Sequence, residues 1–405
     1  MIGEIRKGSR GYLRTARRRT AMADKLLIVH GGGPTAVLNA SLYGALTQAK
    51  ISPRIGEVYG ALGGTKGLVE ERFQRLDTLG ENQLSLLPRT PGTAIGTSRY
   101  PLTQADYPRM RDICLKNGFR YVLFSGGNGT MESCLQFYLV SRDMGIVVAG
   151  IPKTVDNDIT GTDHAPGYGS AARFAASACA AMNQDVKSLP IHVSILELMG
   201  RNAGWITAST ALARRKEGDA PHMILLPERP FDQEVFLKEV EALYKKYGGV
   251  VVAASEGLKD LKGQHIVPPI FTSGRATYYG DVGTHLAGLI IQHMGIKSRS
   301  EKPGMLGRCA MEYQSHTDRE EAVQAGAEAV RCVVEEQGGV MVAFERISSD
   351  PYRLRLIRIP LEQAALKERT MPDEFIAPNN MDVTPEFLTW AKPLIGGPLP
   401  EYFQW

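Results

Sequence analysis

Residues 121–158 read YVLFSGGNGTMESCLQFYLVSRDMGIVVAGIPKTVDND, and this stretch holds two apolar runs that each end in a polar or glycine-rich turn. The runs Tyr121–Ser125 and Ile146–Ile151 are rich in β-branched and aromatic residues, which favour strands. A helical pattern separates them. Two such strands joined by a helix predict a parallel pair whose faces are covered by helices.

The same alternation continues on both sides of this unit. Apolar runs predict further strands, and three-to-four-residue periodicity predicts helices between them. We therefore expect an α/β protein with mainly parallel sheets, in which ligands bind beyond the carboxyl ends of the strands. The further strands are expected at Lys25–His30, Ile191–Leu198, Met223–Leu226, Val250–Ser255, Val340–Phe344 and Tyr352–Ile359, and helices at Phe231–Tyr247, Gly283–Met294 and Thr317–Glu336.

Composition narrows the class of protein. The chain has 405 residues, of which 43% are hydrophobic and 22% charged, as in a soluble globular protein of two or three domains or of two large lobes. No run of roughly 18 apolar residues predicts a transmembrane helix. The five cysteines are far apart, which favours free thiols in a reducing cytoplasm.

Charge is concentrated at the start of the chain. Residues 1–22 carry a net charge of +6, so the remainder carries −2 and offers no broad basic surface for a nucleic acid. We expect this basic segment to be a disordered tail that the activity does not need. Two other readings stay open: a targeting arm, or a protein that starts at Met22.

Glycine clusters follow the predicted strands. The run Gly31–Ala36 comes directly after the first strand, and a glycine turn leading into a helix presents backbone N–H groups to an anion such as phosphate. The run also fits a dinucleotide-binding motif, which expects an acid about 20 residues later at a strand end. Glu57 has that spacing but lies inside its strand. A second cluster, Gly126–Thr130, again lies between a strand and a helix.

The turn Pro152–Asp158 carries the most specific chemistry in the chain. It places Lys153 beside Asp156 and Asp158, which a turn that only reverses the backbone does not require. Phosphoryl transfer needs such a set: a cation for the moving group, a carboxylate base for the acceptor hydroxyl, and an acid that holds a metal ion. After another predicted strand, Arg201 could clamp a phosphate or carboxylate.

These motifs resemble those of the phosphofructokinase family, and they occur in the family's order from about Leu26 onwards. Within the family, the sequence is most similar to the short bacterial branch described as using pyrophosphate. The resemblance implies two facing Rossmann-like lobes with mainly parallel sheets and an active site in the cleft between them. It rests on Gly31–Pro34, Pro91–Arg99, Gly126–Thr130, Pro152–Asp158, Met199–Arg201 and Ser255–Gly257.

The resemblance also implies a layout of the chain. Residues 23–405 would form the catalytic region, with a donor-binding lobe over roughly 23–165 plus later segments. A sugar-phosphate lobe would follow over roughly 166–330, and residues 331–405 would wrap around the body.

The reaction and the site residues are implied in the same way. A phosphoryl group would pass from pyrophosphate to the C1 hydroxyl of fructose 6-phosphate, giving fructose 1,6-bisphosphate in a reversible step. Asp156 would be the general base, and Mg²⁺ would be the cofactor. The catalytic set would be Lys153, Asp156, Asp158 and Arg201; the donor site Gly32, Gly33, Arg99, Gly129 and Thr130; the sugar site Thr154, Asp156, Met199, Gly200, Arg201, Glu256, Lys302 and Arg308; and the metal site Asn128 and Asp158.

Three positions depart from the family pattern. Asn128 stands where relatives carry a magnesium-binding aspartate, although an amide oxygen can also coordinate a hard cation. His192 stands where many relatives carry an arginine that reaches a neighbour's sugar site. Lys153 is a marker of pyrophosphate users, whereas Gly129 lacks the aspartate that usually accompanies it. We expect pyrophosphate as the donor, and an ATP-dependent 6-phosphofructokinase is the alternative.

Other functions compete with this reading. Gly31–Ala36 and Gly167–Ala172 together suggest an NAD-dependent dehydrogenase, which would leave Lys153–Asp158 unexplained. The change at Asn128 suggests a non-catalytic sensor of phosphate ligands. Sedoheptulose 7-phosphate has the same reacting end as fructose 6-phosphate and is not excluded. By analogy with the family we expect a cytoplasmic homodimer or homotetramer that binds neither nucleic acid nor membrane.

Overall fold

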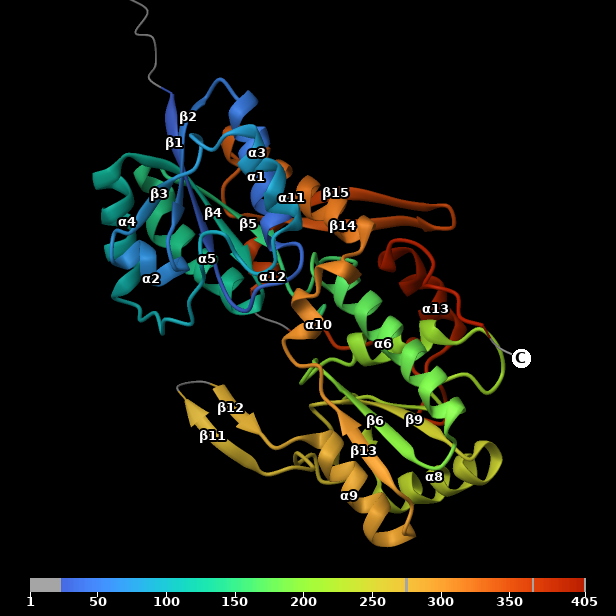
Figure 1. The fold of residues 1–405 in the computed structure, drawn as a ribbon. Helices are drawn as coiled ribbons and strands as arrows, with labels where there is room; N and C mark the ends of the chain where they lie inside the picture. Colours follow the sequence, from blue (N-terminus) through green and yellow to red (C-terminus); the bar gives the residue numbers. More distant parts are fainter. Residues whose placement is uncertain (1–22, 274–275, 366–367, 404–405) are drawn as a thin grey trace, which may run out of the picture.

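The computed structural model describes residues 23–273, 276–365 and 368–403. The basic segment 1–22 lies outside these residues, so the expectations for it stay predictions. The described chain forms two α/β lobes, one above the other in Figure 1. Within these residues no helix has the length and apolar character needed to cross a membrane.

The first lobe contains a seven-stranded sheet in the order β15-β14-β5-β4-β1-β2-β3. The five inner strands run parallel, while β3 and β15 pair antiparallel at the two edges. The strands are β1 (Asp24–His30), β2 (Ile55–Ala61), β3 (Phe73–Arg75), β4 (Phe119–Gly126), β5 (Val147–Pro152), β14 (Val340–Ser349) and β15 (Tyr352–Pro360).

Helices cover both faces of this sheet, as the apolar strands require. One core lies between the sheet and α1, α3 and α11, and the other between the sheet and α2, α4, α5 and α12. The inner strands are therefore buried on both sides. The helices are α1 (Leu38–Ile51), α2 (Gly64–Val69), α3 (Glu81–Leu86), α4 (Asp106–Asn117), α5 (Asn128–Ser141), α11 (His316–Val334) and α12 (Leu361–Ala364).

The second lobe has a smaller parallel sheet in the order β13-β6-β9-β7. Helices α6 and α7 cover one face, and α8 and α9 cover the other. Its elements are α6 (Tyr168–Ser188), β6 (Val193–Leu198), α7 (Trp205–Ser209), β7 (Met223–Leu225), β8 (Pro230–Phe231), α8 (Gln233–Tyr247), β9 (Val250–Ser255), β10 (Lys259–Asp260), α9 (Val282–Met294), β13 (Ser298–Glu301), α10 (Leu306–Cys309) and α13 (Pro385–Ala391).

A hairpin of β11 (Pro269–Ser273) and β12 (Ala276–Tyr279) leaves the second lobe and projects towards the underside of the first (Figure 1). Its exposed strands carry large apolar side chains: Ile270 is 74% exposed and Phe271 is 61% exposed. The hairpin therefore forms an arm beside the gap between the lobes.

The α/β fold with mainly parallel sheets is confirmed, and each predicted strand is present with its ends moved by a few residues. The path of the chain differs from the predicted layout. Helix α11 packs against α1 of the first lobe, and β14 and β15 extend the first sheet. Residues from Met371 onwards return to the second lobe and pack in the core beneath α6. The late part of the chain is therefore divided between both lobes and is not a single wrap.

The register of the strands brings the predicted motifs together. His30 pairs with Ser125, and Gly126 pairs with Pro152, so β1, β4 and β5 end at the same level. In the second lobe Leu198 pairs with Ser255, so β6 and β9 also end together. Each motif that the sequence places after a strand therefore lies at one of two strand edges.

Candidate active site

The glycine turn after β1 is held against the two neighbouring strand ends. The Gly31 N–H donates to the carbonyl of Ser125 at 2.8 Å. A β-carbon at Gly31 or at Gly126 would lie 2.2 Å from the Thr130 hydroxyl, so both positions require glycine. The turn then runs through Pro34–Val37 before α1 begins at Leu38, so it does not lead directly into a helix as predicted.

A helix N-terminus does lie next to this turn. Helix α5 begins at Asn128, with Gly127 as its N-cap, so Gly129 and Thr130 occupy its first turn. The Thr130 N–H already donates to the Gly127 carbonyl at 2.9 Å, so the N–H groups of Asn128 and Gly129, together with the helix dipole, are the ones placed to favour an anion. A β-carbon at Gly129 would meet no atom within 4 Å, so this side of the turn is open.

Lys153 joins the loop after β5 to the glycine turn. Its ammonium group donates to the Gly33 carbonyl at 2.5 Å, and the side chain is buried. Burial lowers the pKa of Lys153 to about 8, and the positive charges of Arg308 and Arg99 act in the same direction, while Asp156 and Asp158 oppose the shift. This lysine is therefore placed where donor phosphates would meet the glycine turn.

Asp156 lies in the same loop and is half-buried. Burial raises the pKa of Asp156 to about 7, and the negative charges of Asp158 and Glu256 add to the shift, against Lys153 and Arg308. Glu256 belongs to the turn after β9, so a carboxylate of the second lobe affects the pKa of Asp156 in the first. A carboxyl group that titrates near neutral pH suits a general base.

Asp158 is held by its own loop and by α5. Its carboxylate accepts hydrogen bonds from the Thr154 hydroxyl at 3.1 Å and from the Asn128 amide at 2.9 Å. The pKa of Asp158 is raised, mainly by burial. The Thr154 hydroxyl also accepts from the Asp156 N–H at 3.1 Å, so in this structure it organises the loop rather than facing open space.

Arg201 follows β6 in a loop with a constrained backbone. Gly200 has φ +117°, which favours glycine, and its carbonyl accepts a hydrogen bond from Ser255 at 2.6 Å. A β-carbon at Gly257 would lie 1.7 Å from the Arg201 carbonyl. The Arg201 guanidinium lies 5.6 Å from the ring centre of Tyr279. Burial raises the pKa of Glu256, and the charge of Arg201 opposes that rise.

Two cations lie at different depths in the second lobe. Lys302 bridges Glu197 at 2.7 Å and Asp281 at 2.6 Å. Arg308, in α10, reaches the first lobe: a β-carbon at Gly33 would lie 2.6 Å from its guanidinium. Lys302 therefore lies with acids of the second lobe, whereas Arg308 lies beside the glycine turn and Lys153.

Arg99 and His192 lie farther from this centre. The Arg99 guanidinium donates to the Tyr278 hydroxyl at 3.3 Å and so connects the first lobe to the arm of the second. His192 is buried with neither ring nitrogen hydrogen-bonded, and burial and nearby cations lower its pKa. Met199 is partly buried against the core beside α6.

Sequence reasoning missed some contributors. Tyr278 and Tyr279 come from β12, where no motif marks them, and they contact Arg99 and Arg201. Thr97 lies within Pro91–Arg99, and its hydroxyl donates to the Gly32 carbonyl at 2.9 Å. A threonine beside a glycine turn is a signal that could have been used, whereas the tyrosines are brought in by tertiary structure alone.

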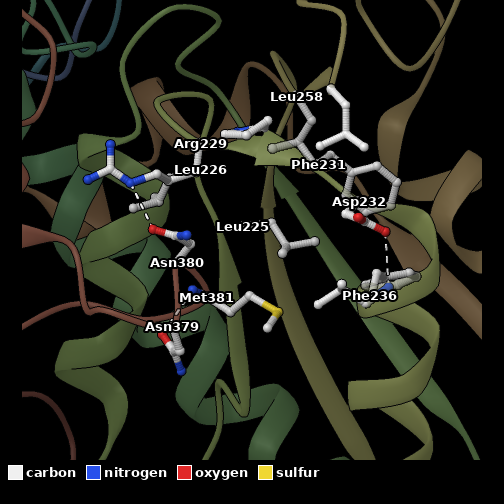
Figure 2. Close-up of a pocket in the computed structure, with 13 residues that line it drawn as sticks. Leu225, Leu226, Arg229, Phe231, Asp232, Phe236, Leu258, Asn379, Asn380 and Met381 are labelled. Carbon is white, nitrogen blue, oxygen red and sulfur yellow. Dashed lines mark hydrogen bonds between the residues drawn. The ribbon is translucent and has the colours of Figure 1, made fainter.

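Figure 2 shows a cavity of about 230 Å³ that lies elsewhere in the second lobe. Its floor is formed by apolar side chains that include Leu225 and Phe236. Its polar side chains are paired with the protein: Arg229 donates to Asn380 at 3.0 Å, and Asp232 caps α8. None of the predicted site residues lines it. The candidate active site is therefore the meeting point of the strand ends and not this cavity.

The fold and this arrangement define an α/β phosphotransferase of two lobes. Residues 25–333 match the phosphofructokinase family, and the chain belongs to that family. A pyrophosphate--fructose 6-phosphate 1-phosphotransferase of Rhodospirillum rubrum is 34% identical over 394 residues, covering 94% of this chain and 96% of that protein. A sulfofructose kinase of Alkalicoccus urumqiensis is 31% identical, covering 87% of this chain and 92% of that protein.

Solved structures give the same result. A pyrophosphate-dependent phosphofructokinase from Nitrosospira multiformis superposes with a TM-score of 0.86 at 32% identity, covering 94% of each chain. The dehydrogenase alternative is not supported. In the second glycine run, the Gly167 and Ser170 N–H groups already donate to the buried Asp318 carboxylate, at 2.8 and 2.9 Å. Those N–H groups are thus occupied by the protein itself.

Proposed function

We propose that this protein transfers a phosphoryl group from pyrophosphate to the C1 hydroxyl of fructose 6-phosphate, giving fructose 1,6-bisphosphate and phosphate. One observation carries the proposal: the half-buried Asp156 carboxyl lies within the charge environment of Lys153, Asp158, Glu256 and Arg308. Those residues come from the loops after β5 and β9 and from α10, so both lobes contribute to one centre.

The roles follow from where each group lies. With its pKa raised to about 7, Asp156 can take the proton of the acceptor hydroxyl at neutral pH and release it without a large cost. The buried Lys153 and the N-terminus of α5 would hold the donor phosphates. Arg201 would neutralise charge on the migrating group, and Tyr279 lies beneath its guanidinium.

The sugar phosphate would lie along the second lobe. Met199, Gly200 and Glu256 come from the ends of β6 and β9, and Lys302 lies beyond them with Glu197. Lys302 would bind the 6-phosphate. Arg308 reaches Gly33, so we assign it to the junction between the donor and the sugar rather than to the 6-phosphate alone.

Asn128 and Asp158 suit a magnesium ion. The Asn128 side-chain oxygen is buried without a hydrogen-bond partner, while its nitrogen donates to Asp158. Among the residues that the structure describes, no group of three or more acidic, histidine or cysteine side chains could hold a metal. Mg²⁺ is often held by one or two protein oxygens together with substrate phosphates. When bound, it would neutralise charge on the phosphates.

Lys153 favours pyrophosphate over ATP as the donor. The ammonium of Lys153 and the backbone N–H groups can bind a small inorganic donor without an adenine pocket. The open space at Gly129 is the feature that leaves ATP as the alternative. The relative from Rhodospirillum rubrum and the solved structure from Nitrosospira multiformis, at 34% and 32% identity, are both named for pyrophosphate.

The donor and acceptor can be tested together. Purified protein with Mg²⁺ and fructose 6-phosphate should form fructose 1,6-bisphosphate with pyrophosphate, and at least ~10-fold more slowly with ATP, in a coupled assay that reports kcat/KM. The reverse reaction with phosphate should also be measurable. Sulfofructose and sedoheptulose 7-phosphate are compared as acceptors. A preference for ATP, or for sulfofructose, would overturn this assignment.

We also propose that the enzyme is cytoplasmic. Cys114, Cys134, Cys179 and Cys332 are free and buried, which agrees with a reducing cytoplasm. A homodimer or homotetramer stays our expectation from the family resemblance.

A further inference from the structure

Residues Glu368–Met371, here termed the clip, run between the two loops that carry the proposed catalytic groups. The Arg369 N–H donates to the Asp158 carbonyl at 2.8 Å, and Glu368 forms an isolated antiparallel bridge with Ile159. The Asp158 carbonyl also accepts from the Asn128 amide at 3.1 Å. The clip therefore fixes the backbone at the residue that lies two positions after Asp156.

The Arg369 side chain continues along the same loop. Its guanidinium donates to the Thr162 carbonyl at 2.8 Å and to the Asp163 carbonyl. The guanidinium also lies over the ring of Trp205, 4.5 Å from its centre, and 6.0 Å from the ring centre of Trp390. A planar guanidinium can stack and donate two bonds at once, which an ammonium group cannot.

The other contacts of the clip reach the loop after β6. The Glu368 carboxylate accepts from the Asn202 amide at 2.8 Å, next to Arg201. The Glu228 carboxylate accepts from the Met371 N–H at 3.0 Å and from the Gly204 N–H at 2.9 Å. Trp205, over which Arg369 lies, starts α7 at the end of the same loop. Glu368, Arg369 and Met371 thus connect the clip to both loops, Met371 through the Glu228 carboxylate.

We propose that Arg369 is a positioning residue that fixes the Asp156–Asp158 loop relative to the Arg201 loop. The inference rests on the proposed function. Asp156 and Arg201 come from different lobes, and no strand pairing joins β5 to β6, so their relative placement depends on contacts between loops. Misplacement by about 1 Å can cost roughly 10²-fold in rate, which makes such a contact matter for turnover.

A merely stabilising role predicts a different result. A residue that only adds to the free energy of unfolding changes the melting temperature but not kcat measured well below it. Replacing a positioning residue lowers kcat in a folded enzyme and leaves unchanged the binding of a donor that the residue does not approach. The clip contacts described above do not involve the glycine turn or Lys153, and they reach the first turn of α5 only through the Asp158 carbonyl that Asn128 shares.

The test uses full-length Arg369→Met and Arg369→Lys. We expect Arg369→Met to lower kcat at least ~10-fold while KM for pyrophosphate stays within about 3-fold, and Arg369→Lys to recover part of the loss. Hydrogen–deuterium exchange should rise in residues 156–165 and 200–204 of Arg369→Met. Arg355→Met is the matched control, because Arg355 is exposed and ion-paired with Glu345.

Asn202→Ala provides an independent route, since it removes the Glu368 contact and leaves Arg369 intact. Its effect on kcat should not add to that of Arg369→Met if both act through the clip. Should Arg369→Met fail to fold, Arg369→Lys and Asn202→Ala carry the test. Wild-type kcat with unchanged exchange in both loops would overturn the inference. An inactive wild-type protein would instead overturn the proposed function, and the exchange data would still report on the clip.

Discussion

At the scale of single residues, burial moves the pKa values of Lys153 and Asp156 towards neutral pH, the first from above and the second from below. The pKa of Lys153 falls to about 8, and the pKa of Asp156 rises to about 7. In each case removal from water is the largest cause, because it penalises the charged form. Position in the fold, rather than residue type alone, therefore makes Asp156 a base suited to neutral pH.

Asp156→Ala tests this role. Turnover should fall at least ~10²-fold, because general-base catalysis contributes about that much. The dissociation constant of fructose 6-phosphate, measured by calorimetry, should change less than about 3-fold, since Lys302 and Glu256 remain. Asp112→Ala removes an exposed carboxylate of α4 and serves as the control. Turnover close to wild type would remove Asp156 from the mechanism.

His164 contributes a pH dependence of a different kind. Its ring nitrogens contact Asp163 at 2.8 Å and Glu321 at 2.7 Å, and the ring is buried. Burial alone would lower the pKa of His164, but the two carboxylates raise it to about 9. Arg346 and the Tyr352 hydroxyl complete the cluster on Asp163 and Glu321. A protonated His164 balances the two acids with Arg346.

The pKa of His164 is higher in the folded state than the ordinary 6.5, so its stabilising effect is complete below pH 6.5 and is lost as the pH rises through 9. The difference between these two pKa values corresponds to about 3 kcal/mol in the free energy of unfolding. The wild-type free energy of unfolding, from urea titrations, should fall across that range, and His164→Gln should flatten the fall. His293→Gln, at an exposed site in α9, should behave like wild type. Equal pH profiles for His164→Gln and wild type would contradict the assignment.

At the scale of elements, helix α11 packs against α1 and also binds the loop between β5 and α6. A β-carbon at Gly44 would lie 1.9 Å from the Val323 carbonyl, and one at Gly326 would lie 1.9 Å from the Ser41 carbonyl. The helices are therefore in backbone contact. Helix α11 also carries Asp318 and Glu321, which bind the loop between β5 and α6. The separation of α1 and α11 therefore affects the candidate active site.

Gly44→Ala tests this packing. The added methyl group must push the helices apart, and we expect a cost of roughly 1–3 kcal/mol in the free energy of unfolding, as for other overpacked interiors. Gly288→Ala is the matched control: it also lies in a helix, but its β-carbon would meet no atom within 4 Å. That change should stabilise by about 0.5–1 kcal/mol through helix propensity. A Gly44→Ala melting temperature at or above the wild-type value would contradict the close packing.

Elements were predicted well where one pattern dominates. The inner strands are continuous apolar runs bounded by glycine or polar turns, so their existence followed from period and composition. The start of α1 did not, because Pro34–Val37 form a separate turn before the helix. The start of the long helix α6 was interpreted only as a rival glycine motif. The Ser170 N–H in its first turn is capped by Asp318, which is 148 residues away along the chain, so no local pattern indicates this cap.

At the scale of the whole molecule, the lobes exchange segments of chain. Helix α11 and the β14–β15 hairpin belong to the first lobe, although they follow the second in sequence. The last segment then returns, and Phe387 and Trp390 pack in the core beneath α6. This path places the clip between the two catalytic loops. A linear division of the sequence into lobes could not anticipate it.

The sequence alone was enough to predict the strand–helix alternation, the family, and a catalytic set of Lys153, Asp156, Asp158 and Arg201, because apolar period and charged turns are local in the chain. Tertiary structure decided the rest: that Arg308 reaches Gly33, that Tyr279 lies beneath Arg201, and that residues 368–371 join the two loops. These contacts join residues far apart in sequence, and pKa values depend on burial from all sides. No local sequence pattern indicates these contacts or these pKa values, so only the folded chain specifies them.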